Sequence, residues 1–291
     1  MIAREAVIGQ EDEPIPETCS LEPGTVLTEE EIRQFKRDGY LIKRGIIEPE
    51  YCARACNRFW DDPPPSIKED DPSTWIGPIK PEEESDDPDN FKKGYRWQYR
   101  KVSTEPWIRE GLSFHPFVQS VVNQLLGEGR FTQPERVRGI YGTLPYGDVE
   151  RTPRHMHIDA GQATIGLVCY VDRVEPNGGG FALWPGSHRR FWYTSRSRYR
   201  RELTDAFEPI RKEYDDTWET SSIQTYGDPG DIVFWHRRMA HMASPNYTSN
   251  IRKAVLTDFS WKNVEELGEL PPSKDMWEDW TEAVRDLDDQ Q

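Results

Sequence analysis

Short apolar segments that follow one another from about residue 137 constrain the fold of this chain more than any other feature. The segments are VRGIYGTL, TIGLVCYV, GGFALW, GDIVFW and RKAVLTDFSW, and glycine, proline and aspartate lie between them. They are rich in β-branched and aromatic residues, which fit a pleated, half-buried surface. Several short strands separated by turns predict a sandwich or a jelly roll.

Helices are expected to flank these strands. The first begins at Thr28, because this residue and Glu31 three positions later have the form of a capping box, and it ends at Asp38-Gly39. A short strand and two more helices are expected at residues 40–42, 48–60 and 114–127. The predicted fold class is therefore mostly β with flanking helices.

One domain is expected over residues 27–262, because all-β sandwiches and barrels often extend to about 250 residues as one unit. An acidic arm precedes it at residues 1–26, and a polar tail with a predicted helix (MWEDWTEAVRDL) follows at residues 263–291. Residues 61–94 are rich in proline, serine and acidic residues, so they predict a long, lid-like surface loop. Residues 189–216 interrupt the strands as an insertion.

The composition limits the partners and the compartment. A net charge of −15 disfavours nucleic acid, which attracts basic surfaces. No apolar run reaches the ~18 residues of a membrane span, and the N-terminus lacks the apolar core of a signal peptide. The cysteines form neither a disulfide framework nor a zinc pattern: Cys19, Cys52, Cys56 and Cys169. A reducing, cytoplasmic location is therefore expected.

Three side chains predict a metal site. In RHMHID, residues 155, 157 and 159 alternate, so on a strand their side chains leave the same face. His157 and Asp159 can then direct an imidazole and a carboxylate at one point, and His241, shortly after GDIVFW, can supply a third ligand. Two histidines and one carboxylate occupy one face of an octahedral Fe(II) and leave three positions open. His155 is expected at the rim of this site, and His236 is the rival for the third ligand.

Arg252 follows His241 by 11 residues, at the start of the next predicted strand. A buried guanidinium at that place needs an anionic partner. A dicarboxylate that chelates the metal through its keto-acid end can pair its far carboxylate with this arginine in a bidentate manner. The ordered set of four residues therefore predicts an iron site with a keto-acid co-substrate.

Over residues 27–260 the chain resembles the phytanoyl-CoA dioxygenase family of Fe(II)/2-oxoglutarate oxygenases. The passages that carry the resemblance are LTEEEIRQFKRDGYLIKRGII, HPFVQSVVNQLLG, HMHID, NGGGFALWPGSH, and GDIVFWHRRMAHMASPN followed by IRKAV. The resemblance implies a double-stranded β-helix (a cupin-like jelly roll) with His157, Asp159 and His241 as iron ligands. It also implies that Arg252 binds the C5 carboxylate of 2-oxoglutarate.

Two details of the resemblance concern individual residues. Many family members carry Gln three residues before the first metal histidine, where it helps to bind the co-substrate, and this chain has Arg154 there. That contact is open between Arg154, Thr164 and Gln98. Halogenases of the family replace the ligand carboxylate by a small residue, so the presence of Asp159 favours hydroxylation or a related oxidation.

The resemblance implies an enzyme that uses Fe(II), 2-oxoglutarate and O₂ to oxidise an unactivated C–H bond of a small organic substrate, with release of succinate and CO₂. A natural-product intermediate is among the substrates of such enzymes. Two other functions stay open: a non-catalytic jelly-roll protein that binds a small ligand, and a Zn or Mn cupin-type isomerase or hydrolase. No feature of the sequence indicates an oligomeric state.

The insertion holds six arginines interleaved with aromatic residues: Arg189, Arg190, Arg196, Arg198, Arg200 and Arg201. This local positive charge can receive an anionic substrate, such as a carboxylate, a phosphate or a CoA ester. It can equally form a solvated face that pairs with the acidic loops. Four aromatic residues in or near the lid are open to a pocket-lining or a core role: Trp75, Trp97, Tyr99 and Trp107.

Overall fold

The structure, a computed structural model, describes residues 26–149, 156–159, 161 and 163–288. Its helices are α1 Glu29–Asp38, α2 Pro49–Phe59, α3 Pro106–Glu110, α4 Pro116–Leu126, α5 Ser187–Trp192, α6 Phe207–Asp216, α7 Trp218–Ser221, α8 Val264–Gly268 and α9 Glu282–Arg285. Its strands are β1 Tyr40–Lys43, β2 Asn90–Lys93, β3 Arg96–Tyr99, β4 Phe131–Thr132, β5 Gly139–Thr143, β6 Ile165–Tyr170, β7 Phe181–Leu183, β8 Ile223–Gln224, β9 Ile232–His236, β10 His241–Ala243 and β11 Arg252–Trp261.

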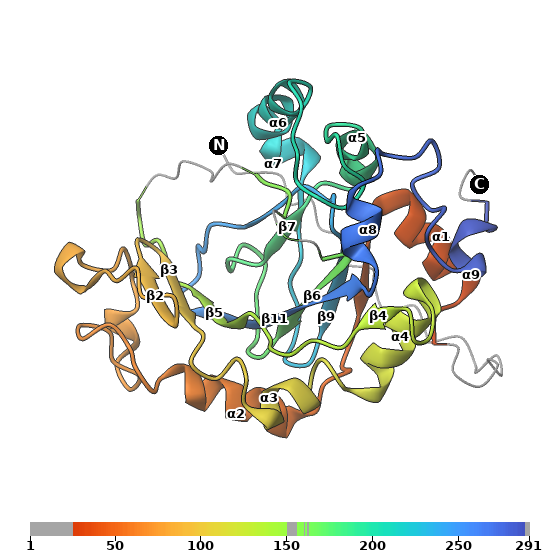
Figure 1. Cartoon of the computed structure of the whole chain (residues 1–291). Coiled ribbons are helices and arrows are strands. Elements are labelled where there is room, and N and C mark those ends of the chain that lie inside the picture. Colours follow the sequence, from red (N-terminus) through yellow and green to blue (C-terminus); the bar gives the residue numbers. More distant parts are fainter. Residues whose placement is uncertain (1–25, 150–155, 160, 162, 289–291) are drawn as a thin grey trace.

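A large antiparallel sheet crosses the middle of the molecule, with α2 and α3 below it and α5, α6 and α7 on the opposite side (Figure 1). Its strand order is β1-β9-β6-β11-β5-β3-β2, and β4 pairs with the end of β11. A second sheet has the order β10-β7-β8. Every strand pair in both sheets is antiparallel.

The two faces of the large sheet bury different sets of side chains. On β11, Val255 and Phe259 belong to the main apolar core together with residues of α1, α2 and α4. Ala254 and Leu256, which alternate with them, pack instead with Phe181 and its neighbours from the small sheet. The two sheets therefore enclose an apolar interior between them, which is the predicted jelly roll with flanking helices.

Local signals at the first helix are confirmed. The Thr28 hydroxyl accepts a hydrogen bond from the Glu31 amide, and the Glu31 carboxylate accepts one from the Thr28 amide. Gly39 ends α1 with φ of 84°, a backbone conformation that favours glycine. The expected elements at residues 40–42, 48–60 and 114–127 are β1, α2 and α4.

The predicted lid-like surface loop at residues 61–94 is in part regular secondary structure. The segment contains two short 3₁₀ helices and β2, which pairs with β3 at the edge of the large sheet. Asn90 is buried there and accepts a hydrogen bond from the indole of Trp97. The four aromatic residues with an open role belong to the main core or pack against it: Trp75, Trp97, Tyr99 and Trp107.

The prediction of one continuous helix over residues 276–287 is also wrong. Only Glu282–Arg285 is helical in that stretch, as α9. Trp277 and Trp280 lie before it and pack against Phe35 of α1, with ring centroids 6.0 and 5.6 Å away. Burial of these two indoles against α1 therefore replaces the regular helix.

None of the helices in the described part of the chain combines the length and apolar character needed to cross a bilayer. Cys52, Cys56 and Cys169 are free thiols. Cys169 is buried, as expected for its position in β6. Cys19 and nearly all of the N-terminal arm lie outside the described residues.

Candidate metal centre

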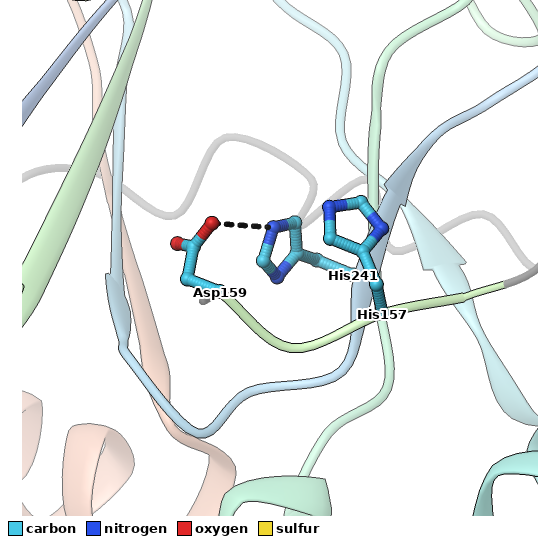
Figure 2. A group of neighbouring side chains, drawn as sticks. All are labelled: His157, Asp159 and His241. Atoms are coloured by element: carbon cyan, nitrogen blue, oxygen red, sulfur yellow. Dashed lines mark ion pairs between the residues drawn. The ribbon is translucent and has the colours of Figure 1, made fainter. Parts of the chain in front are cut away.

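Main-chain pairing brings two histidines together. His241 is the first residue of β10, and His157 forms an isolated antiparallel bridge with it. The amide of each donates to the carbonyl of the other, with N···O distances of 3.1 and 2.9 Å. Their imidazole rings, 4.4 Å apart between centroids, consequently lie side by side (Figure 2).

Asp159 joins the two histidines from the segment beyond the bridge. Its Oδ1 lies 3.7 Å from Nε2 of His241, the contact drawn as a dashed line in Figure 2. One ligand atom from each of the three residues lies within 4.8 Å of the others. Among the described residues, no other group of three or more His, Cys, Asp or Glu side chains converges in this way. The three residues predicted from the sequence are therefore neighbours.

The protonation states suit a divalent cation, which needs neutral imidazoles and an ionised carboxylate. Burial lowers the pKa of His241, and its Nδ1 lies 2.9 Å from the carbonyl of Met239. A proton on Nδ1 would donate to that carbonyl and leave Nε2 for a metal. Desolvation, then the neighbouring His241 and the charges of Arg138 and Arg201, lower the pKa of His157 to about 3, although this side chain is the exposed member of the group.

Asp159 stays ionised for a separate reason. Burial alone would raise its pKa, but the electrostatic interaction with His241 and the charge and hydrogen bonds of the Arg138 guanidinium outweigh burial and hold the pKa below its usual range. Two neutral imidazoles and one carboxylate on one side, with His157 exposed, are the donor set of an iron site with open positions. The residues present therefore fit an Fe(II) ion.

Arg252 lies on the wall of the same interior. It opens β11, is only 7% exposed, and its Nε donates to the carbonyl of Gly179 at 2.9 Å. Gly179 precedes Phe181 by two residues, and the Phe181 ring is 5.1 Å from that of His241. Alternation along β11 puts Arg252 on the face that contributes to the interior between the sheets.

Gln98 also lies on this inner face. It pairs across the strands with Tyr141, which packs against the interior cluster, and directly opposed residues share a face. Its side-chain oxygen accepts a hydrogen bond from Arg100, whose Nε also contacts the Tyr141 hydroxyl at 3.2 Å. The carbonyl of Tyr141 accepts a bond from Nη1 of Arg252 at 3.3 Å. Gln98 is thus linked to Arg252 through Tyr141.

The other predicted residues lie differently. Thr164 is fully buried, and its hydroxyl accepts a hydrogen bond from the Trp261 amide at 3.4 Å. His236, the rival for the third ligand, ends β9 and packs on the opposite side of the strand, with its ring 5.5 Å from that of Trp280. It is not part of the three-residue group. Arg154 and His155 lie outside the described residues.

Sequence reasoning missed two charged residues beside the metal group. The Arg138 guanidinium donates to Oδ2 of Asp159 at 3.0 Å and also pairs with Asp258 at 2.6 Å. Asp258 lies six residues after Arg252 on β11 and so shares its inward face. An acidic residue on the inward face of an otherwise apolar strand was the available signal.

Three of the six insertion arginines have acidic partners among the described residues. Their carboxylate partners are Glu213 for Arg190, Glu278 and Asp279 for Arg198, and Glu265 and Glu269 for Arg200. Arg189 donates to the carbonyl of Lys36. Arg196 and Arg201 form no ion pair among the residues that the structure describes. For Arg190, Arg198 and Arg200, the predicted pairing with acidic segments is therefore observed, in place of a free positive patch for a substrate.

Known proteins resemble this chain in sequence. The profile of the family "Phytanoyl-CoA dioxygenase (PhyH)" matches residues 35–254. A curated relative, a probable phytanoyl-CoA dioxygenase of Caenorhabditis elegans, is 24% identical over 243 residues, which cover 80% of this chain and 75% of the relative.

Solved structures share the fold. The non-haem α-ketoglutarate-dependent carbocyclase SnoK from nogalamycin biosynthesis has a TM-score of 0.52 at 20% identity, and the match covers 84% of this chain and 92% of SnoK. EctD from S. alaskensis with bound Fe has a TM-score of 0.53 at 14% identity, covering 91% and 85%. EctD with 2-oxoglutarate and 5-hydroxyectoine gives 0.51 at 15%, covering 81% and 76%. These likenesses confirm the jelly-roll fold.

Proposed function

The chain belongs to the phytanoyl-CoA dioxygenase family and is by class an Fe(II)/2-oxoglutarate-dependent oxygenase, and we propose that it hydroxylates an unactivated C–H bond of a small organic molecule. The observation that carries the proposal is the convergence of His157, Asp159 and His241 within 4.8 Å. In the proposed site these three side chains hold the iron. The bound iron would supply activation of O₂ coupled to decarboxylation of 2-oxoglutarate to succinate.

Arg252 is proposed to orient the co-substrate. Its guanidinium is held by the carbonyls of Gly179 and Tyr141. A fork of N–H donors held in this way suits the distal carboxylate of 2-oxoglutarate. Gln98 shares the inner face and is the described candidate nearest to this arrangement through Tyr141. Thr164 is less suited to contact the co-substrate, because its hydroxyl already accepts a hydrogen bond from the Trp261 amide.

The intact carboxylate ligand favours oxygen transfer to carbon over halogenation. It also speaks against a degenerate site that only binds a ligand, since all three donors keep the protonation states that a metal requires. A zinc or manganese isomerase of similar fold has no dicarboxylate co-substrate for the buried Arg252 to bind.

The substrate is proposed to carry an anionic group that meets Arg201. This exposed guanidinium lies 5.8 Å from the ring centroid of Phe207. Phe207 packs in one apolar cluster with Met156 and Ile158, the two residues that flank His157. The charge of Arg201 also contributes to the lowered pKa of His157, which places this guanidinium near the metal group. The similar structures include a carbocyclase from nogalamycin biosynthesis and a complex with 5-hydroxyectoine, so natural products are the substrate class to test first.

Replacement of the carboxylate ligand tests the proposed function. Asp159→Ala is expected to abolish both stoichiometric Fe(II) binding and succinate formation from 2-oxoglutarate. Asp216→Ala is the matched control, because it removes an exposed aspartate of α6 that forms an ion pair with Lys212, away from the metal group. Succinate formation by Asp159→Ala at the rate of the parent protein would show that this site is not the catalyst.

A further inference from the structure

The two oxygens of the Asp159 carboxylate have different neighbours. Oδ1 faces His241, with 3.7 Å to Nε2. Oδ2 accepts a hydrogen bond from Nη2 of Arg138 at 3.0 Å, and Oδ1 accepts a longer one from Nη1 of the same arginine at 3.4 Å. A carboxylate can bind a metal through one oxygen or through both. The shorter bond from Arg138 is to Oδ2, and Oδ1 is the oxygen that faces His241.

Arg138 is itself held on three sides. Its Nε and Nη2 donate to Oδ2 and Oδ1 of Asp258 at 2.6 and 2.7 Å, a fork-shaped pair that fixes the plane of the guanidinium. The guanidinium also lies 5.8 Å from the ring of Trp235, which in turn is 5.7 Å from the ring of His241. Its amide donates to the carbonyl of Leu256 on β11 at 2.6 Å.

A glycine in the neighbouring strand β6 leaves room for the Trp235 ring beside Arg138. Asp258 pairs across the strands with Gly166, and Trp235 pairs with Gly166 from the other side. A Cβ on Gly166 would lie 2.1 Å from the Trp235 ring, so only glycine leaves room for that indole. The side chains of Arg138 and Asp258 are 26% and 27% exposed, so both remain partly accessible to solvent.

The charges of this cluster allow a sharp test. Arg138 contributes one positive charge, and Asp159 and Asp258 contribute one negative charge each, so the three together carry −1. Without Arg138 the net charge becomes −2, which by charge alone would attract a divalent cation more strongly. If the role of Arg138 is instead to orient Asp159, its loss must weaken metal binding despite the more favourable charge.

We propose that Arg138, held by Asp258, is a positioning residue that keeps Asp159 bound to the metal through a single oxygen. The inference rests on the proposed function only in that Asp159 is a metal ligand. Single-oxygen binding keeps three coordination positions open for the co-substrate and O₂, whereas two-oxygen binding would occupy one of them. Partners of metal-bound carboxylates typically change metal affinity about 10- to 100-fold when they are replaced.

The experiment is a Mn(II) titration of the metal-free protein, followed by electron paramagnetic resonance of free Mn(II), with the Co(II) absorption spectrum as a report on coordination. Arg138→Gln is expected to weaken Mn(II) binding about 10- to 100-fold and to change the Co(II) spectrum. Asp258→Asn, which frees the arginine from its anchor, is expected to act in the same direction. Equal or tighter Mn(II) binding by a folded Arg138→Gln, with an unchanged Co(II) spectrum, would overturn the proposal.

Two further variants distinguish failure of the positioning role of Arg138 from failure of the proposed metal site. Arg58→Gln is the matched control, because Arg58 makes a similar fork-shaped pair with Glu105, at 2.8 Å for both bonds, on α2; its Mn(II) affinity should equal that of the parent. Asp159→Ala in the same titration tests the metal site itself. Loss of Mn(II) binding in Asp159→Ala but not in Arg138→Gln refutes the positioning role alone. If Arg138→Gln does not fold, the Co(II) spectrum of Asp258→Asn decides, and an unchanged spectrum counts against the proposal.

Discussion

Replacing Arg252 by methionine should remove the discrimination of this protein for a dicarboxylate co-substrate. Methionine keeps the length of the side chain but removes the charge and the N–H donors. Because Arg252 is only 7% exposed, water would screen little of its interaction with a bound carboxylate. The lost interaction is therefore close to the full value of a buried, charge-assisted pair.

The magnitude follows from such pairs. Hydrogen bonds to charged groups contribute about 1.5–3 kcal/mol each, and truncation of one partner of a buried charge pair costs about 2–5 kcal/mol. A loss of about 3 kcal/mol corresponds to about a 100-fold weaker interaction, because each 1.4 kcal/mol is a factor of ten. The KM for 2-oxoglutarate should accordingly rise about 100-fold.

A comparison of two keto acids isolates this contact. 2-Oxopentanoate has the chain length of 2-oxoglutarate but ends in a methyl group in place of the distal carboxylate. The parent protein should prefer 2-oxoglutarate by about 100-fold in kcat/KM for decarboxylation, and Arg252→Met should treat the two acids almost equally. Lys253→Met is the matched control, because this adjacent cation lies on the other face of β11, where it pairs with Asp172 at 2.6 Å. Retention of the preference by Arg252→Met, or its loss in Lys253→Met as well, would refute the assignment.

Two other predictions follow from charges in the structure. Arg201→Ala should raise the KM for an anionic substrate up to about fivefold, as expected for an exposed ion pair, and should reduce the dependence of KM on ionic strength. Arg196 is another exposed cation of the same segment, and Arg196→Ala should change neither quantity. Equal effects of the two variants would show that only the net charge matters. Burial lowers the pKa of His188 to about 3. In the unfolded chain this histidine binds a proton near its ordinary pKa of about 6.5, whereas in the folded chain it stays neutral at that pH. The free energy of unfolding should then fall as the pH drops below about 6.5, by up to about 1.4 kcal/mol per pH unit; urea unfolding of His188→Gln at several pH values should give a shallower dependence, and an unchanged slope would contradict this reasoning.

Elements that depend on neighbouring residues in the chain were predictable. The capping box of Thr28 and Glu31 and the glycine that ends α1 act within a few residues, so a local pattern identifies them. The short segments rich in β-branched and aromatic residues from residue 137 onward likewise predicted the strands of the jelly roll. The His-x-Asp pair was visible for the same reason, since one short segment carries both side chains.

Elements that depend on distant partners were not predictable in this way. Strand β2 is polar and was taken for a loop, yet it is held at the sheet edge by its pairing with β3 and by the contact of Asn90 with Trp97. The tail was expected to be helical from residue 276, but Trp277 and Trp280 are buried against Phe35, which is more than 200 residues away in the chain. Tertiary burial of two indoles outweighed the helical spacing of the segment.

The metal group shows which part of a site can be predicted from the sequence and which part cannot. His157 and His241 are placed by two main-chain hydrogen bonds, so the backbone alone sets the distance between their rings. Asp159 lies beyond that bridge in a segment without regular secondary structure, and a side-chain anchor takes the place of the backbone. That anchor, Arg138, is fixed by Asp258, which lies 120 residues further along the chain. A sequence motif can therefore identify the residues that bind the metal. It cannot identify Arg138 as the residue that orients Asp159, because Arg138 and Asp258 come together only in the folded sheet.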